Sequence, residues 1–525
     1  MNGRIYSPWA RAASALLIDG GQVAWLGDDA SAATMAADRV VDLAGALVIP
    51  AFVDAHFHAT ATGLALTGLN LAGADSLAGA LAELERHARG GAGRPVLGSG
   101  WDETGWPERR APTAAELDRA SYGGMVYLAR TDAHSAIASS ALMASVPGLD
   151  TLPGYSPDGY LTKDAHHAAR EVAMSVITAG QRAELQRTAL RRAAALGIGA
   201  VHEMAGPEIS SADDLAGLLA LARSDDALPE VAGYWGELHG TATALELGAV
   251  GAGGDLFCDG SIGSHTAGMH QPYADRPAES GYLRYDTAEL AEHITACTEA
   301  GIQAGFHAIG DAATDQVVAA MRRAIEQLGP QVATAGHRIE HAELISDVAG
   351  LSETGLVASV QPAFDATWGG PDGMYAQRLG ADRAARLNPL AALAAAGIPL
   401  ALGSDSPVTP IDPWGTLRAA AYPRYRKHAL SPRAALTAHC RGGWRAARAD
   451  GDGSGVLAPG MPASYAIFAA GELAVDAPDG RLAQWSTDER AGVPGLPDLA
   501  PGQDLPRCLR TVLRGRQLFD SGALG

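Results

Sequence analysis

The segment Val53-Asp-Ala-His-Phe-His58 decides the fold, because it is an apolar β-type run that ends in two histidines. On a strand, residues two apart point to the same face, so the imidazoles of His56 and His58 can reach one ion. Imidazole nitrogen is a good ligand for zinc and other borderline metals. Alone, such a pair is more often two surface or hydrogen-bonded core histidines. Residues elsewhere in the chain are therefore needed to distinguish a metal site from ordinary histidines.

Similar β-type runs recur along the middle of the chain, with helical stretches rich in Ala, Leu and Arg between several of them. The predicted strands are Phe52–His58, Pro95–Gly100, Met125–Ala129, Gly199–His202, Val231–Trp235, Asp255–Asp259, Gln303–His307, Arg338–His341, Val357–Gln361 and Pro399–Gly403. This alternation of strands and helices indicates a parallel α/β architecture. Because more than eight runs qualify as strands, we expect some of them to belong to insertions.

Polar residues that could bind a metal or a substrate stand at the ends of these runs. They are His56, His58, Trp101, Asp102, Asp132, His134, His202, Glu203, Asp259, His307, His341 and Asp405. In an α/β barrel, functional residues lie at the C-terminal ends of the strands. His307, His341 and Asp405 close three separate runs and add nitrogen and oxygen ligands to the first pair. Taken singly, the two histidines could also be buried and bonded to backbone, and Asp405 could be a turn residue.

Both ends of the chain differ from the middle, because they contain short strand-like pieces separated by turn residues. Ala15–Ile18 and Gln22–Leu26 flank Asp19-Gly20-Gly21, a turn sequence that favours the positive φ values of a tight hairpin. Further strand-like pieces are Ala46–Ile49, Ala466–Phe468 and Arg510–Arg514. We therefore expect a small β domain assembled from both termini.

A series of motifs along most of the chain resembles one family. Besides the opening segment they are Gly100-Trp-Asp102, Pro112-Thr113, Leu117-Asp118, Asp132-Ala-His134, Asp259-Gly-Ser-Ile-Gly-Ser264, Thr266-Ala267, His307-Ala-Ile-Gly-Asp311, His337-Arg-Ile-Glu-His-Ala342 and Gly403-Ser-Asp-Ser-Pro407. In order and spacing they resemble the amidohydrolase superfamily (amidohydrolase family 3), and within it the N-substituted formamide deformylase branch. The resemblance implies an α/β fold, with a distorted (β/α)8 TIM barrel over residues 51–450 and a small β-sandwich domain built from residues 1–50 and 451–525.

The resemblance also implies the roles of individual residues. The metal ligands would be His56, His58, His307, His341 and Asp405. Asp405 would also handle the proton, and His134 or His265 would stabilise the oxyanion. The predicted substrate-pocket residues are Trp101, Asp102, Asp132 and Asp259, with core packing as the alternative for Trp101 and a structural role as the alternative for His134. The cofactor would be one or two divalent ions, zinc in the first place, with manganese or iron as alternatives.

Asp255 departs from the pattern of that branch. Relatives usually carry a lysine four residues before the Asp-Gly, where its carbamylated form can bridge two metals, whereas this chain has Asp255 before Asp259-Gly260. An aspartate carries its carboxylate on a much shorter arm. Three outcomes stay open: Asp255 is a ligand after a local backbone shift, the site holds one metal, or another carboxylate, such as Glu203 or Asp259, replaces the lysine.

The predicted activity is metal-dependent hydrolysis of an amide- or formamide-type C–N bond in a small molecule. The metal would lower the pKa of a bound water toward ~7, and Asp405 would accept its proton and protonate the leaving nitrogen. A deaminase or cyclic-amide hydrolase would use the same barrel. The alternative from another class is a catalytically silent, metal- or ligand-binding regulatory homologue. Aromatic residues in the loops Trp101–Trp106, Ser261–His270 and Trp368–Tyr375 hint at an apolar or aromatic N-substituent.

Composition argues against several other classes of protein. The net charge of −20 disfavours a nucleic-acid or anionic-membrane partner, and no apolar run approaches the ~20 residues of a membrane helix. The four cysteines form no C-x-x-C pair and we expect no signal peptide, so a reducing cytoplasm is the predicted location. Gly90–Gly93 and Gly251–Gly254 lack the context of a phosphate-binding loop and are predicted to be ordinary loops. A homodimer is left open.

The remaining histidines and one glutamate are expected to have no part in the chemistry. His166, His167, His239, His293 and His428 are predicted to lie on the surface or in loops. Glu340 should point to the strand face opposite His341, where it could pair with Arg338.

Overall fold

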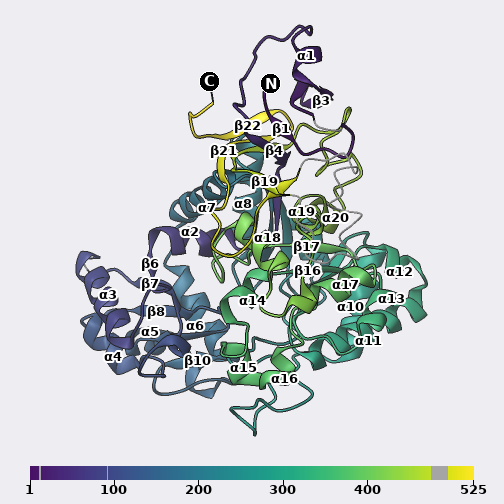
Figure 1. Ribbon diagram of the computed structural model, residues 1–525. Coiled ribbons are helices and arrows are strands. Elements are labelled where there is room, and N and C mark those ends of the chain that lie inside the picture. The colour runs from purple at the N-terminus through teal and green to yellow at the C-terminus, as the bar shows by residue number, and fades with distance from the viewer. Residues whose placement is uncertain (11–12, 92, 475–494, 525) are drawn as a thin grey trace.

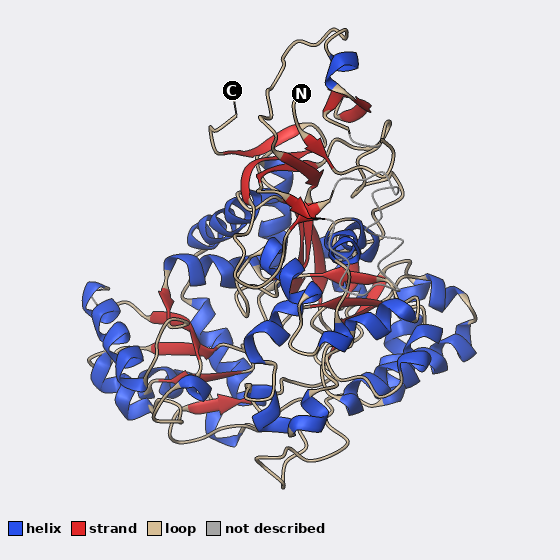
Figure 2. Ribbon diagram, viewed as in Figure 1, coloured by secondary structure: helices blue, strands red, loops and turns tan. Residues whose placement is uncertain are grey.

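Eight parallel strands form a closed barrel at the centre of the molecule (Figures 1 and 2). The computed structural model describes residues 1–10, 13–91, 93–474 and 495–524. In sheet order the barrel strands are β17 (Leu400–Leu402), β16 (Val357–Val360), β15 (Arg338–His341), β14 (Gln303–Ala308), β13 (Gly251–Ala252), β12 (Glu230–Trp235), β11 (Ile198–Ala205) and β5 (Phe52–Phe57). A parallel bridge between Phe57 and Ser406 joins the end of the last strand to the first. The predicted α/β barrel is therefore confirmed.

Helices surround the barrel, and local sequence explains where they begin. They are α2 (Ala59–Thr67), α7 (Ala179–Ala194), α8 (Ala212–Ser224), α9 (Thr241–Leu247), α10 (Thr287–Glu299), α11 (Asp311–Leu328), α12 (Gln331–Thr334), α13 (Val348–Glu353), α14 (Pro362–Trp368), α15 (Met374–Leu379), α16 (Ala381–Ala384), α17 (Leu390–Ala395), α18 (Pro413–Ala421), α19 (Pro432–His439) and α20 (Arg441–Ala446). Thr178 and Gln181 form a capping box at the start of α7, which satisfies two backbone N–H groups there. The buried face of α7, including Ala189 and Leu190, packs into the core around the barrel.

Strands from both ends of the chain form a second sheet above the barrel (Figure 1). Its order is β1 (Arg4–Ile5), β4 (Leu47–Pro50), β18 (Tyr465–Ala469), β21 (Arg507–Leu513) and β22 (Arg516–Asp520). The predicted N-terminal hairpin is formed by β2 (Ala15–Asp19) and β3 (Gln22–Gly27), and Gly20 and Gly21 in its turn have φ values of 54° and 79°. Both chain ends thus contribute to one β region. The limits of the two predicted domains stay a prediction.

An insertion between β5 and β11 forms a separate five-stranded sheet beside the barrel (Figure 2). Its strands are β6 (Leu69–Asn70), β7 (Val96–Trp101), β8 (Val126–Arg130), β9 (Ser135–Ala138) and β10 (Tyr160–Thr162), and its helices are α3 (Leu77–Gly90), α4 (Ala114–Ala120), α5 (Ser140–Ser145) and α6 (Lys163–Ser175). The predicted strands Pro95–Gly100 and Met125–Ala129 are therefore the surplus ones. Trp101, Asp132 and His134 come from this insertion and not from the barrel.

The predicted strand Asp255–Asp259 is wrong, because the barrel strand in this region is the earlier segment β13. Gly253 and Gly254, with φ values of 151° and 80°, end that strand. A Cβ atom on Gly253 would lie 2.1 Å from the backbone nitrogen of Gly305, so glycine is needed for the close approach of the two strands. A strand made of such small residues has no apolar pattern to detect. As a result, Asp255 follows directly after a barrel strand.

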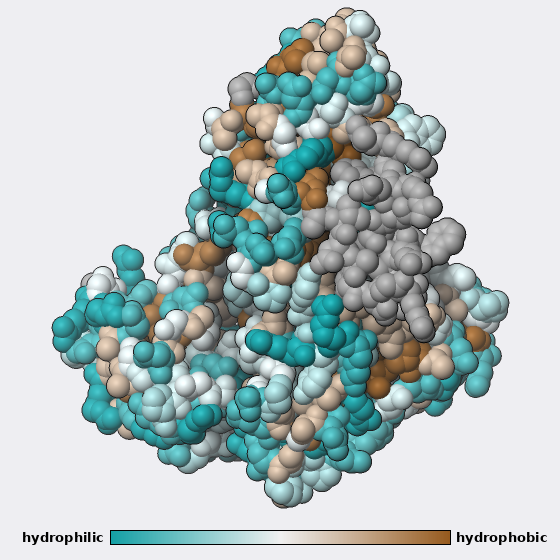
Figure 3. Space-filling model, in the orientation of Figure 1, coloured by the Kyte–Doolittle hydropathy of each residue, from teal (hydrophilic) through white to brown (hydrophobic). Residues whose placement is uncertain are grey.

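The polarity of the outer surface is what we expect of a protein whose apolar side chains pack in an internal core. The face shown in Figure 3 is mostly hydrophilic or neutral, with hydrophobic residues scattered between. Among the described residues, none of the helices combines the length and the apolar character that crossing a membrane requires.

Candidate metal centre

The polar residues at the C-terminal ends of the barrel strands converge on one point. His56 lies on β5 and His58 directly after it, His307 lies on β14, and His341 ends β15. Asp255 and Asp405 follow β13 and β17, so six side chains from five strands meet. His341 and Asp405 have φ values of 67° and 53°. Non-glycine residues rarely adopt positive φ, and those that do cluster at functional sites.

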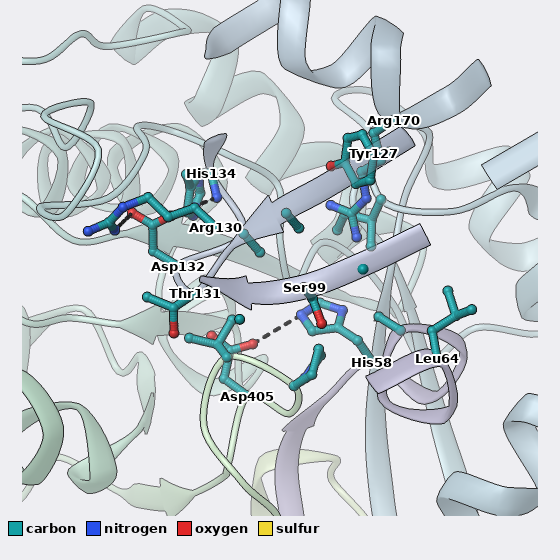
Figure 4. A pocket seen from close by; sticks show the side chains of 18 of the residues that line it. His58, Leu64, Ser99, Tyr127, Arg130, Thr131, Asp132, His134, Arg170 and Asp405 are labelled. Atoms are coloured by element: carbon teal, nitrogen blue, oxygen red, sulfur yellow. Dashed lines mark hydrogen bonds and ion pairs between the residues drawn. The ribbon is translucent and has the colours of Figure 1, made fainter. Parts of the chain in front are cut away.

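Two carboxylates lie between the histidines. Asp255 Oδ2 is 3.3 Å from Nε2 of His56 and 3.3 Å from Nε2 of His58, while its other oxygen is 3.5 Å from Nε2 of His341. Asp405 Oδ1 is 3.1 Å from Nε2 of His58, and Figure 4 shows this pair at the side of the pocket. One oxygen of Asp255 therefore contacts His56 and His58, and the other contacts His341.

The donor set fits a divalent metal ion. Three groups of three residues bring their ligand atoms within 4.8 Å of one another: His56, His58 and Asp255; His56, His341 and Asp405; and Asp255, His307 and His341. Asp255 Oδ1 and Asp405 Oδ1 are buried, and neither accepts a hydrogen bond from any residue that the structure describes. Buried carboxylate oxygens without partners are costly unless a cation compensates them. Imidazole and carboxylate ligands together suit zinc, manganese or iron.

The electrostatics of the cluster also favour a cation. Burial lowers the pKa of His58, but the close carboxylates of Asp255 and Asp405 outweigh it and raise the pKa to about 9. Burial raises the pKa of Asp255, but His56 and the other histidines hold it well below its usual value. The carboxylates thus stay negative and attract positive charge, which either protons or a metal ion can supply.

The second nitrogen of each histidine lies beside an outer partner, and it forms a hydrogen bond in His56, His58 and His341. Nδ1 of His56 is 3.0 Å from Glu340 Oε2 and Nδ1 of His58 is 2.9 Å from the carbonyl oxygen of Met204. Nδ1 of His341 is 2.8 Å from Gln361 Oε1, and Nδ1 of His307 is 3.3 Å from Asp259 Oδ1. Such contacts fix the tautomer and the ring orientation of metal-binding histidines. They point Nε2 of His56, His58 and His341 toward the carboxylates.

Arg338 anchors this outer shell. Its fully buried guanidinium donates to both oxygens of Glu340 (2.8 and 3.0 Å) and to the carbonyl oxygen of Ala55 (2.7 Å). The expected Arg338–Glu340 pair is therefore present, but Glu340 also contacts His56, which the sequence reasoning missed. Strand alternation places Glu340 and Arg338 on one face and His341 on the other. It does not show that the face of Glu340 is the one that points into the barrel, where His56 lies.

Replacing Arg338 should destabilise the fold. In Arg338→Met the carboxylate of Glu340 stays buried without its partner, so we expect the free energy of unfolding to fall by about 3–5 kcal/mol. The matched control is Arg322→Met, because Arg322 lies on the exposed side of α11 and its side chain is 47% exposed. That variant should stay within about 0.5 kcal/mol of the parent. Urea unfolding followed by circular dichroism measures both, and equal stability of the two variants would contradict the structural role of Arg338.

The insertion contributes one histidine to the cluster. His134 Nε2 is 3.2 Å from His307 Nε2. Burial, with His307 as the next contribution, lowers the pKa of His134 to about 3. Asp132 holds the turn before it: one oxygen accepts from the His134 backbone N–H (3.3 Å), and the other from Arg130 Nη1 (2.9 Å) and the Ser264 hydroxyl (2.7 Å).

Other predicted site residues lie outside the cluster. Trp101 is fully buried in the core of the insertion, where its indole N–H donates to the carbonyl oxygen of Leu128. Asp102 pairs with Arg130 (3.0 Å). Asp259 accepts hydrogen bonds from the backbone N–H groups of Ile309 and Gly310, so it lies behind His307 and not in the open pocket. His265 pairs with Asp275 (3.0 Å) and lines neither cavity at the cluster.

Two cavities adjoin the cluster. The larger, about 960 Å³ counted out to its mouth, lies between the barrel and the insertion and reaches His58, Asp255, His341 and Asp405. The smaller, about 330 Å³, shares His134, His307, His341 and Asp405 with the larger one and is also lined by Phe364, Trp368 and Tyr375. A substrate can therefore extend from the cluster into both cavities, with its bulkier part in the larger cavity.

Comparison with known proteins agrees with this geometry. A family profile described as "Amidohydrolase family" matches residues 39–519. The chain belongs to this family. A metal-dependent hydrolase of uncharacterised function from Pyrococcus horikoshii has a similar structure, with a TM-score of 0.71 and 28% identity over 89% of this chain and 96% of that one. The amidohydrolase is thus a metal-dependent hydrolase of C–N bonds, as predicted.

Two curated relatives show how far the resemblance reaches. Protein LONG AFTER FAR-RED 3 of Arabidopsis thaliana is 28% identical over 476 residues, which are 82% of this chain and 79% of that protein. N-substituted formamide deformylase of Arthrobacter pascens is 31% identical over 139 residues, 25% of each chain. The match to the deformylase is too short to place this amidohydrolase in that branch.

Several residues near the centre of this amidohydrolase were not predicted. Gln361 follows β16 directly, so the rule that barrel strands end in functional residues could have found it. Arg130 and Arg170 also border the larger cavity. The expectation that His166, His293 and His428 are surface or loop residues is wrong, since all three are buried. Each binds an internal partner, as His293 does with the carbonyl oxygen of Ala252 (3.0 Å).

Proposed function

We propose that this amidohydrolase cleaves the C–N bond of an amide or formamide in a small molecule, with zinc as its metal. The observation that carries the proposal is the pair of buried carboxylate oxygens, of Asp255 and Asp405, that face three histidine Nε2 atoms on the wall of a large cavity. An inert scaffold gains nothing from two buried carboxylates that accept no hydrogen bond at these oxygens.

The residues that would hold the metal fall into two overlapping sets. His56, His58 and Asp255 would hold one ion and His307, His341 and Asp255 a second, with Asp255 common to both sets. A divalent ion bound there supplies Lewis acidity, which lowers the pKa of a water toward ~7 and polarises the substrate carbonyl.

Asp405 is the proposed proton carrier. Its Oδ1 is buried beside His58, accepts no hydrogen bond from the described residues, and borders both cavities. Its carboxylate would accept the proton of the attacking water and then donate it to the leaving nitrogen. A proton on that nitrogen is needed because an amide anion is a very poor leaving group.

His134 is the proposed oxyanion-stabilising group. Its ring borders both cavities, and the hydrogen bonds of Asp132 with Arg130 and Ser264 fix the turn that carries it. Donors held in place before the reaction stabilise developing charge without reorganisation. His265, the other histidine considered for this role, pairs with Asp275 and lines neither cavity.

Two further expectations about the protein belong to this proposal. A cytoplasmic location is supported by the four free, buried cysteines, Cys258, Cys297, Cys440 and Cys508. Light scattering would decide whether the chain forms a homodimer, which stays a prediction.

Metal analysis together with a substrate screen tests the proposal. We expect the purified protein to contain zinc, to release an amine from at least one N-formyl or N-acyl amine, and to lose this activity on treatment with a chelator. Added zinc should restore it. Release of ammonia instead of a carboxylic acid and an amine would favour a deaminase. A protein without bound metal, and without rescue by zinc, manganese or iron, would overturn the proposal.

A further inference from the structure

The larger cavity has one apolar section, formed by Ala61, Leu64, Leu69, Leu97, Met174 and Ile209. Ser99, Arg130, Thr131 and Asp132 also line the cavity, and Arg130 and Asp132 pair with each other. Arg170, on α6, also lines this region. In Figure 4, Arg170 and Tyr127 lie on one side of the pocket and Asp405 on the other. The cavity therefore offers an apolar surface with a positive group remote from the proposed site of reaction.

Arg170 has no partner among the residues that the structure describes. Its half-buried side chain makes neither a hydrogen bond nor an ion pair with any residue in the ranges that the structure describes, whereas Arg130 on the same cavity pairs with Asp102, Glu103 and Asp132. Its charge acts on Tyr127 of β8 and on His166 and His167 of its own helix. Arg170 also borders a neighbouring cavity that the acids Glu171, Glu208 and Asp214 line.

Among the described residues, none of these acids forms an ion pair with Arg170. The Tyr127 hydroxyl is bound to His166 Nε2 (2.8 Å). Glu208, an acid on the neighbouring loop, is engaged by Arg284 (2.7 Å). A half-buried guanidinium without a protein partner keeps its donors available to an anionic ligand in the cavity.

We propose that Arg170 binds a carboxylate at the end of the substrate remote from the scissile amide. The guanidinium presents paired N–H donors that match a carboxylate. Its single positive charge balances a monoanion better than the double charge of a phosphate ester. The apolar wall between Arg170 and the metal centre suits a hydrocarbon spacer. The substrate class is thus an N-acylated amino acid whose amine and carboxylate are separated by an apolar chain, an assignment that rests on the proposed amide hydrolysis.

Matched ligands test this assignment. The probes are ω-formamido acids with spacers of four, six and eight carbons, each paired with its neutral terminal carboxamide. Calorimetry on the zinc-loaded Asp405→Asn protein gives the ratio of the two dissociation constants without relying on turnover. We expect at least one acid to bind about 10- to 100-fold more tightly than its carboxamide.

Variants of the arginine decide whether Arg170 causes the preference. In Arg170→Met the ratio should fall to about 1, and Arg170→Lys should keep an intermediate ratio, because lysine retains the charge but not the paired donors. Arg191→Met is the matched control, because Arg191 is exposed on α7 and lines neither cavity. That control should keep the parental ratio and the parental activity.

The outcomes separate this inference from the proposed function. A ratio near 1 with Arg170 present, a ratio that survives Arg170→Met, or the absence of binding by every probe would overturn the carboxylate assignment. Tighter binding of a formamidoalkyl phosphate than of the matching acid would overturn it as well. Hydrolysis of the neutral carboxamides by the parent enzyme would in that case leave the proposed function intact. Conversely, an acid preference without hydrolysis of any amide would reject the function and keep the anion site.

Discussion

The variant Asp405→Asn is expected to keep its fold and its metal but to lose nearly all turnover, with kcat lower by about 10²- to 10⁴-fold. The asparagine has almost the same shape and retains one oxygen at the position of Oδ1, which lies 3.1 Å from His58 Nε2. It cannot accept the proton of the attacking water or return one to the leaving nitrogen. The loss should therefore appear in kcat and not in KM, and steady-state kinetics on any amide from the screen measures it.

A control variant separates this effect from a general disturbance. Asp382→Asn makes the same chemical change at an exposed position on α16, outside both cavities, and should have parental kcat. Zinc content and thermal unfolding should match the parent in Asp382→Asn and stay close to it in Asp405→Asn. Parental turnover by a metal-loaded Asp405→Asn protein would show that another group moves the proton.

The barrel could be predicted from the sequence because most of its strands are apolar runs with a polar end. The strand Arg338–His341 was predicted with the bounds that the structure has. Such runs are buried on both faces of a parallel sheet, and the loop that follows carries the functional group. The Gly251–Ala252 strand could not be found in this way, because it has only two small residues and is followed by Gly253 and Gly254, which pack against Gly305 where a side chain has no space.

The insertion could be anticipated only as a surplus of strands. Val96–Trp101 and Val126–Arg130 pair in parallel with a helix between them, which is also the local pattern of a barrel strand. Which sheet a strand joins depends on contacts between distant segments, and hydrophobic periodicity does not encode them. For the same reason Trp101 could not be assigned, since a core indole and a pocket indole have the same local sequence.

The convergence of the histidines could be predicted, but their outer partners could not. His56, His58, His307 and His341 stand at strand ends, and closure of the barrel brings them together. Glu340 reaches His56 across the barrel, 284 positions away in the chain. Arg170 lies within a helix of the insertion, where a solvent-exposed arginine is the ordinary expectation. Contacts of this kind follow from the folded geometry alone.

The replacement of Asp255 by alanine should remove most of the bound metal. Because Asp255 lies between His56 and His58 on one side and His341 on the other, its loss removes an oxygen from both proposed ion sites. We expect two ions per chain in the parent, at most one in Asp255→Ala, and a loss of affinity for the remaining ion of at least about 100-fold. Elemental analysis of the purified proteins measures the stoichiometry.

Thermal unfolding with and without a chelator gives a second measurement, independent of activity. Since an ion that binds only the folded state stabilises it, the chelator should lower the Tm of the parent and of Asp382→Asn, but should change that of Asp255→Ala little. If Asp255→Ala held as many ions as the parent, another carboxylate, such as Glu203, would have to serve the cluster. One ion in the parent and one in the variant would instead mean that Asp255 does not join two ion sites. We propose that the short side chain of Asp255 suffices for a bridge, because Gly253 and Gly254 follow β13 directly and their positive φ values turn the backbone that carries Asp255 to the histidines.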